Sequence, residues 1–293
     1  DDVEITLEAN PGTVNLDSLS GYRQAGVARL SLGVQSFDNR MLVALGRIHT
    51  AEENRTALTL ARQAGFESIG IDLICGLPEQ TMTHWQDSLQ QAISLQPDHL
   101  SVYGLTVEEG TPFATRYPDD STELPDDDQT AAMLEDADSR LTTAGYEHYE
   151  IANFARPGKR SQHNCGYWQR DGYLGIGPGA HSFLRQGWGI RWGNQGDYGT
   201  WADAIRNNRL AATEQQELTR EDALSEVIFL GLRMADGISL SNYAEQFDER
   251  LDQRYAEEIR QLQQAGLITC TPDRLALTKQ GMLLSNQVFV RFV

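Results

Sequence analysis

The sequence predicts an α/β fold in which helices cover a parallel sheet, followed by a smaller helical domain. Over the first hundred residues, short runs rich in β-branched residues alternate with helix-length segments. Such alternation is typical of parallel sheets, because each helix carries the chain back to the start of the next strand. From residue 221 the composition turns helical. We therefore expect a domain boundary near residues 200–220.

The elements of the first part follow one another in a regular order. The expected strands are Val3–Ala9, Val27–Gln35, Ser68–Cys75, His99–Leu105 and Tyr146–Asn153. The expected helices are Leu16–Gln24, Asn39–Leu45, Ala51–Ala64, Trp85–Leu95 and Gln129–Ala144. Glycines that follow several of these helices are typical stop signals. The acidic, proline-bearing stretch 118–128 is expected to be an exposed loop.

The second part divides into an irregular segment and a helical module. Residues 156–199 are rich in glycine and aromatic side chains and have little regular pattern. The expected helices are Glu221–Met234, Leu240–Gln246, Leu251–Ala265 and Lys279–Asn286, with short strands at Gly266–Thr269 and Arg274–Thr278. Helix, strand, turn and strand in this order resemble a winged-helix module. We expect three regions, with residues 1–155, 156–215 and 216–293.

Composition excludes several classes of function. The 293 residues carry 24 Lys and Arg against 42 Asp and Glu, a net charge of −18. This balance disfavours nucleic acid and anionic membranes as partners. The three cysteines show no CxxC spacing, so a reducing cytoplasm is expected. No leader-like segment or apolar run near the roughly 18 residues of a membrane helix is visible. The oligomeric state stays open, a dimer included.

Polar side chains stand at or near the ends of the predicted strands. Glu8 lies where the first strand gives way to a turn, Gln35 ends the second, Arg47 lies in a loop, and Asp72 interrupts an apolar strand. Ligand sites of α/β proteins lie at the carboxyl ends of their strands. A buried carboxylate is costly unless it is paired. One interpretation is therefore a structural Arg47–Asp72 ion pair, and the other is a site in which Arg47 binds a ligand carboxylate.

The segment from His163 to Ser182 concentrates the chemistry of a ligand site. It opens with His163-Asn164-Cys165-Gly166-Tyr167-Trp168 and continues to His181, past three alternate glycines. Imidazoles, flat apolar rings and close backbone approach suit a planar or metal-bearing ligand. For His181, a structural role in the glycine turn is an equal alternative. The glycines do not follow the strand-to-helix context of a dinucleotide loop, so a tight turn is favoured.

Seven sequence blocks carry a family resemblance. They are EITLEANPGT, RLSLGVQSF, LGRIHT, DLICGLP, YEIANFARPG, HNCGYW and YLGIGPGAHS. In this order they resemble the radical S-adenosylmethionine (SAM) proteins around oxygen-independent coproporphyrinogen III oxidase, and most of all their heme-chaperone (HemW) branch. The resemblance implies a partial (β/α)6 barrel with a C-terminal helical, winged-helix-like domain. It implies a cytoplasmic protein that binds heme and transfers it to an apo-haemoprotein.

The resemblance also implies site residues. SAM would be bound by Glu8, Gln35, Arg47 and Asp72, with Tyr103 and Gly104 beside the adenine. The HNxxYW signature, which is His163, Asn164, Tyr167 and Trp168 here, is associated with heme, and His163 would be the candidate iron ligand. No catalytic residue is implied.

One departure from the family pattern concerns the iron–sulfur cluster. The family binds a [4Fe-4S] cluster through CxxxCxxC and backs the methionine moiety with a GGTP loop, and neither motif occurs here. The chain is expected to start before the third barrel strand of its relatives. Whether it is an enzyme stays open. The alternatives are an oxygen-independent coproporphyrinogen III oxidase and a non-catalytic remnant that uses its C-terminal module for protein contact.

Overall fold

The computed structural model describes residues 3–118, 121–212 and 215–292. The chain divides into two compact units, unit 1 (Asp1–Arg160) and unit 2 (Ser161–Val293). The division falls close to the expected limit between regions 1–155 and 156–215, and earlier than the boundary expected near 200–220. The glycine- and aromatic-rich segment therefore lies in unit 2 apart from its first residues. No helix in the described part of the chain is both long and apolar enough to cross a bilayer.

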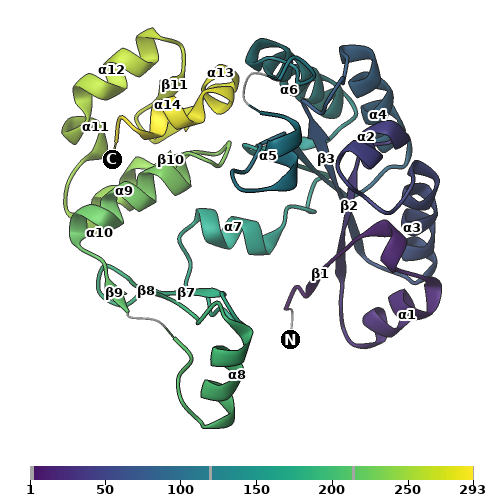
Figure 1. Ribbon diagram of the computed structural model, residues 1–293. Helices are drawn as coiled ribbons and strands as arrows, with labels where there is room; N and C mark the ends of the chain where they lie inside the picture. The colour runs from purple at the N-terminus through teal and green to yellow at the C-terminus, as the bar shows by residue number, and fades with distance from the viewer. Residues whose placement is uncertain (1–2, 119–120, 213–214, 293) are drawn as a thin grey trace. The chain divides into compact units, whose positions relative to one another are not determined.

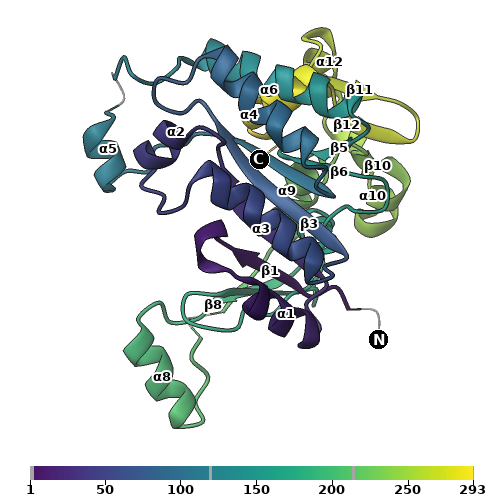
Figure 2. The same cartoon turned by 90° about the vertical axis from the view of Figure 1, so that its right-hand side faces the viewer.

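Unit 1 is a mixed sheet with helices on one face (Figures 1 and 2). The strand order is β1-β2-β3-β4-β6-β5, parallel from β1 to β4 and antiparallel beyond. The strands are β1 (Thr6–Ala9), β2 (Arg29–Gln35), β3 (Ser68–Cys75), β4 (His99–Gly104), β5 (Glu147–Glu150) and β6 (Asn153–Ala155). The helices are the 3-10 turn Pro11–Thr13, α1 (Leu16–Gln24), α2 (Asn39–Ala44), α3 (Ala51–Gln63), α4 (Met82–Ser94), α5 (Pro112–Arg116) and α6 (Asp127–Thr143).

The period-two alternation of the strands explains the one-sided core. Leu30, Leu32, Ile71 and Leu100 are buried in the core shared with the helices. The intervening positions carry polar or small side chains and face the other way. Strand register places Glu8 beside Ser31, and Asp72 beside Ser101. One face of the sheet is therefore apolar and packed, and the other presents a polar row.

Local signals fix the ends of the helices. Helix α3 begins with a capping box, in which Thr50 and Glu53 each bond the backbone of the other. Helix α4 has a similar box at Thr81 and is tied to α6 by the Trp85 indole, which donates to the Met133 carbonyl at 2.9 Å. These contacts hold the loops at the carboxyl ends of the strands.

Unit 2 contains two small antiparallel sheets. One is β7-β8-β9, made of His181–Leu184, Ile190–Gly193 and Gln216–Glu217, and the other is β10-β12-β11, made of Ile238–Ser239, Arg274–Leu277 and Ile268–Cys270. The helices are α7 (Gln162–Trp168), α8 (Tyr198–Arg206), α9 (Arg220–Gly231), α10 (Leu240–Phe247), α11 (Leu251–Arg254), α12 (Ala256–Gln264), α13 (Lys279–Leu283) and α14 (Ser285–Phe289). The expected order of helix, strand, turn and strand is present in α12, β11 and β12.

The structure corrects several sequence predictions. The strand expected at Tyr146–Asn153 is a hairpin, because a turn at 151–152 reverses the chain into β6. The sheet is consequently not wholly parallel. The helix expected at Leu251–Ala265 is broken at Tyr255, whose φ of −112° is not helical. The helix expected at Lys279–Asn286 is likewise two short helices that meet at Leu284. Helices α5, α7 and α8 and strands β7 and β8 were not expected.

The predicted acidic loop lies only partly within the described residues. Residues 119–120 of the stretch 118–128 lie outside them, and α6 already begins at Asp127. Asp126 caps that helix by accepting from the Gln129 amide at 2.7 Å. The last acidic residues of the stretch are therefore part of a helix N-terminus, where negative charge is favoured.

Candidate functional site

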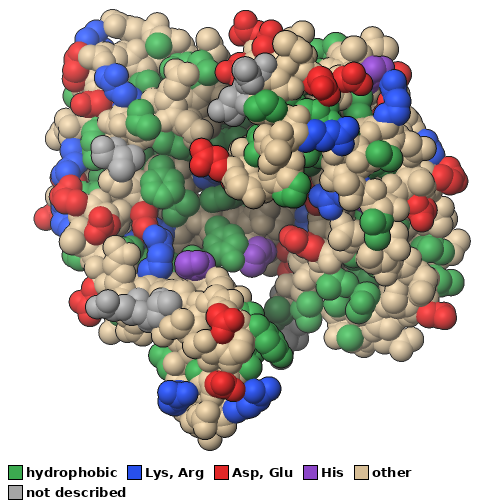
Figure 3. All heavy atoms as spheres, viewed as in Figure 1, with side chains coloured by type: hydrophobic (Ala, Val, Ile, Leu, Met, Phe, Trp, Pro, Cys, Tyr) green, Lys and Arg blue, Asp and Glu red, His purple; other side chains and the backbone are tan. Residues whose placement is uncertain are grey.

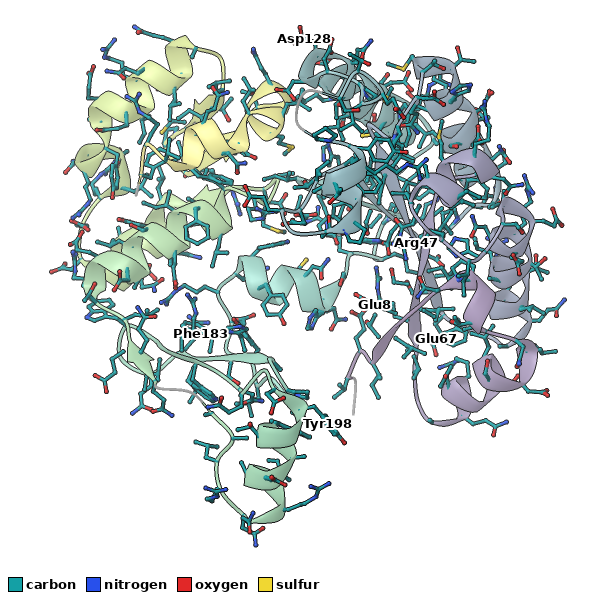
Figure 4. All side chains as sticks on the ribbon, in the orientation of Figure 1. Glu8, Arg47, Glu67, Asp128, Phe183 and Tyr198 are labelled. Carbon is teal, nitrogen blue, oxygen red and sulfur yellow. The ribbon has the colours of Figure 1, made fainter. Side chains whose placement is uncertain are left out.

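The polar side chains predicted at the strand ends gather at one edge of unit 1. Arg47 lies in the loop after α2 and donates to the Asn10 side chain, just beyond β1, at 3.2 Å. Figure 4 labels Glu8 and Arg47 at this edge. Among the described ion pairs, Arg47 is not joined to Asp72, so the structural pair considered from sequence is wrong. The Arg47 guanidinium remains half-buried and able to meet a ligand carboxylate.

Asp72 is a half-buried carboxylate in the middle of the polar row. Burial raises its pKa above the usual range and nearby Glu8 raises it further, while hydrogen bonds from Ser101 and Ser31 and the charge of Arg29 oppose the shift. The Ser31 hydroxyl lies 3.4 Å from its Oδ1. The row therefore offers carboxylate oxygens to hydroxyl or cationic donors of a ligand. Sequence analysis missed Ser31 and Ser101, although both interrupt apolar strands at period-two positions.

Gln35 adopts a backbone conformation that side chains seldom take. Its φ is +64° at the carboxyl end of β2, in the left-handed region that favours glycine. A Cβ added to Gly33 would come within 2.9 Å of the Gln35 Nε2 and 3.4 Å of the Asn10 Oδ1. The amide thus folds back over Gly33 toward Asn10, the residue that Arg47 also contacts. Strained residues of this kind concentrate at functional sites.

Tyr103 and Gly104 end β4, next to the end of β3. Register places Tyr103 beside Ile74 and Gly104 beside Cys75. The Tyr103 side chain is exposed. An exposed ring at the carboxyl edge of the sheet suits stacking against a flat group, and glycine beside it leaves the backbone accessible.

The HNxxYW signature forms helix α7 in unit 2. The irregular structure expected for residues 156–199 is therefore wrong at these positions. Ser161 caps the helix, accepting from the Asn164 amide. Positions four apart share a helix face, so His163 pairs with Tyr167, and Asn164 with Trp168. The His163 and Tyr167 rings meet edge to face at 4.6 Å. His163 is exposed and open to a ligand.

Aromatic contacts continue from α7 into β7. Tyr167 meets Tyr173 edge to face at 4.7 Å, and Tyr173 lies 6.1 Å from Phe183. Figure 3 shows histidine and hydrophobic side chains gathered in this part of the surface, and Figure 4 labels Phe183 on β7. On the other face of α7, Arg233 stacks over the Trp168 ring at 4.2 Å. The motif is therefore anchored on one face and open on the other.

The glycine segment before β7 is a tight turn, as the sequence indicates. A Cβ at Gly175 would lie 2.2 Å from the His181 carbonyl, so only glycine fits there. The turn is held by Ser182, which accepts from the Gly175 amide, and by Asn194, which donates to the Gly175 and Gly177 carbonyls. His181 is exposed on β7. The turn projects Ile176 outward, and its side chain is 91% exposed.

The cysteines do not fit an iron–sulfur cluster. Cys75 is buried in the core of unit 1, and burial raises its pKa to about 12. Cys165 and Cys270 lie on α7 and β11. Within the described residues, no group of three or more His, Cys, Asp or Glu could hold a metal ion.

Two family models and several known proteins match this chain. Residues 1–92 match the Radical SAM superfamily and residues 218–284 the HemN C-terminal domain. The heme chaperone HemW of Bacillus subtilis (strain 168) is 38% identical, over 99% of this chain and 76% of that protein. HemW of Escherichia coli (strain K12) is 48% identical over 61% of this chain and 47% of that protein.

A solved structure matches the fold over nearly the whole chain. Coproporphyrinogen III oxidase (HemN) of Escherichia coli, a radical SAM enzyme, has a TM-score of 0.84 and 26% identity, with 99% of this chain and 70% of that chain covered. The fold and its polar strand ends thus define an α/β protein of the radical SAM class. Within that class, the chain belongs to the HemW family of heme chaperones.

Proposed function

We propose that this chain binds heme at α7 and passes it to an apo-haemoprotein. The observation that carries the proposal is the geometry of the HNxxYW signature, which leaves His163 exposed on a capped helix and places the Tyr167 ring against it. A neutral imidazole is a common axial ligand of heme iron. The HemW relatives are named as heme chaperones.

We also propose that unit 1 is the larger part of a (β/α)6 barrel that binds SAM at its polar strand ends. The residues fit the ligand: Arg47 suits the carboxylate, Asp72 the ribose hydroxyls, and Glu8 and Gln35 the remaining polar groups of the methionine moiety. Tyr103 and Gly104 would lie beside the adenine. When bound to a reduced cluster, SAM supplies a 5′-deoxyadenosyl radical. The residues of this chain bind and orient SAM.

One feature favours a carrier that acts on heme without altering it: the helix that presents His163 is open to the surface. Because His163 is exposed, heme bound there can also leave again, as a carrier requires. Beyond unit 1, we propose that the winged-helix-like end of unit 2 serves packing or protein contact, which a net charge of −18 favours over contact with nucleic acid.

Heme titration followed by absorbance tests the proposal. We expect the full chain to bind heme and to shift its absorption band, and His163→Ala to change the spectrum and weaken binding about tenfold or more, as for loss of a strong directed contact. His84→Ala, in unit 1, is the matched control and should leave both unchanged. Wild-type affinity and spectrum in His163→Ala would rule out His163 as a ligand.

A second assay addresses the enzymatic alternative. Coproporphyrinogen III would be incubated anaerobically with the chain, SAM and a reductant. We expect no protoporphyrinogen, since a carrier releases its porphyrin cargo unaltered. Clear formation of protoporphyrinogen would overturn the assignment as a carrier.

A further inference from the structure

A small cavity lies within unit 2 directly beside the HNxxYW helix. Its volume is about 210 Å³, and its lining includes Tyr167, Trp168, Tyr173, Phe183, Arg170 and Arg191. Pockets that enclose whole drug-sized ligands measure roughly 300–1,000 Å³. This cavity can therefore admit one arm of a large ligand but not a whole macrocycle.

The cavity has an excess of positive charge. Arg170 donates to one oxygen of Glu226 at 2.8 Å, and Arg191 lies 2.7 Å from the other. Two guanidinium groups thus share one carboxylate. Asp171 also lines the cavity, but its carboxylate is paired with Arg185 at 3.1 Å. A partly buried positive charge without a full counter-charge is costly, so the cluster favours an added anion.

The two arginines have different roles in this cluster. The Arg170 side chain is buried, donates also to the Trp188 carbonyl and stacks over Phe183 at 4.7 Å. The Arg191 side chain is 37% exposed and lies over the same ring at 5.6 Å. Arg170 is therefore a fixed support, and Arg191 is the guanidinium that a ligand can reach.

Apolar rings connect the cluster with the candidate iron ligand. The rings of His163, Tyr167, Tyr173 and Phe183 follow one another in contact, at centroid distances of 4.6, 4.7 and 6.1 Å. A ligand on this path meets an imidazole at one end, aromatic faces along its length and a cationic group at the other end. Heme has matching chemistry: a metal, a flat apolar macrocycle, and two propionate carboxylates at one edge.

We propose that Arg191, supported by Arg170 and Glu226, binds a propionate carboxylate of the heme carried at α7. The inference rests on the proposed heme binding and adds to it the residue that recognises the charged edge of the cargo. A guanidinium suits this task because its parallel N–H groups match the two oxygens of a carboxylate. A guanidinium at this position also favours heme over porphyrins whose propionates are esterified.

Paired titrations with hemin and hemin dimethyl ester, in the same detergent, test the inference on the full chain. We expect the wild type to bind hemin about tenfold or more tightly than the ester, as for one charge-assisted contact. Arg191→Gln should weaken hemin binding by a similar factor and leave ester binding unchanged, and Arg191→Lys should restore part of the loss. The matched control is Arg206→Gln, which removes an exposed arginine of α8 whose ion-pair partner, Asp203, does not line this cavity.

The outcomes separate the inference from the function on which it rests. If the wild type binds neither ligand, heme binding itself fails and the inference falls with it. If the wild type binds hemin and the ester equally, or if Arg191→Gln weakens both to the same extent, propionate recognition is overturned while heme binding stands. The wild-type comparison needs no variant, so it decides the question even if Arg191→Gln does not fold.

Discussion

At the scale of single residues, a buried histidine in unit 1 gives the fold a defined pH response. His99 on β4 is buried, and its Nε2 lies 2.8 Å from the Tyr149 hydroxyl. Burial, with the charge of Arg29 adding to it, lowers the pKa of His99 to about 3. In the unfolded chain a histidine has a pKa of about 6.5. Below pH 6.5 the unfolded state therefore takes up a proton that the folded state does not.

This difference predicts that stability is lost as pH falls from 6.5 toward 3. Below pH 6.5, His99 contributes a loss of up to about 1.4 kcal/mol per pH unit in the free energy of unfolding. Urea denaturation at pH 7.5, 6.0 and 5.0 should show this loss in the wild type and a smaller one in His99→Gln, which keeps a hydrogen-bonding side chain. Equal pH dependence in both proteins would show that the pKa of His99 is the same in the folded and unfolded states.

At the scale of single residues, part of the proposed SAM site could be predicted from the sequence. Glu8, Gln35 and Asp72 stand out because polar residues interrupt or end apolar strands, and Arg47 because its loop lies near a strand end. The structure brings Gln35 and Arg47 together around Asn10. The positive φ of Gln35 could not be foreseen, since nothing in its residue type requires it. The charge cluster of Arg170, Arg191 and Glu226 was also missed, because its members are far apart in sequence.

At the scale of elements, the glycine turn before β7 offers a sharp test of packing. We expect Gly175→Ala to destabilise unit 2 by about 1–3 kcal/mol, because its Cβ would overlap the His181 carbonyl and force the turn open. Gly196→Ala is the matched control in the same unit, since a Cβ there meets nothing within 4 Å. Thermal unfolding measures both, and equal melting temperatures would show that the turn adapts freely.

Elements with a clear apolar period could be predicted, including the short helix α2 and strand β12, but elements without such a period could not. The structure confirms helix Leu16–Gln24 and strand Ser68–Cys75 with the expected bounds. Helix α7 escaped prediction because it has only seven residues, contains Gly166 and consists largely of aromatic and polar residues. The hairpin of β5 and β6 was predicted as one strand because its two-residue turn, Ile151-Ala152, lacks the usual glycine, asparagine or proline.

At the scale of the whole molecule, each proposed ligand site is built from one unit. The strand ends proposed for SAM belong to unit 1, whereas α7, β7 and the arginine cluster belong to unit 2. Alternating strands and helices predicted the first unit from sequence. The division after Arg160 lies close to the expected limit between residues 155 and 156, whereas the boundary expected near 200–220 falls inside unit 2. The sites can consequently be altered one at a time.

This separation predicts a crossed pattern of losses. Arg47→Ala should weaken SAM binding more than threefold, since a charge-assisted contact contributes about 1.5–3 kcal/mol, and should leave the heme affinity measured without SAM within twofold. His163→Ala should do the reverse. Equilibrium dialysis with labelled SAM and absorbance titration with heme measure the two affinities on each full-length variant. If SAM changes the heme affinity of the wild type, heme must change the SAM affinity by the same factor. Loss of both ligands in either variant would contradict separate sites, provided that its unfolding temperature equals that of the wild type.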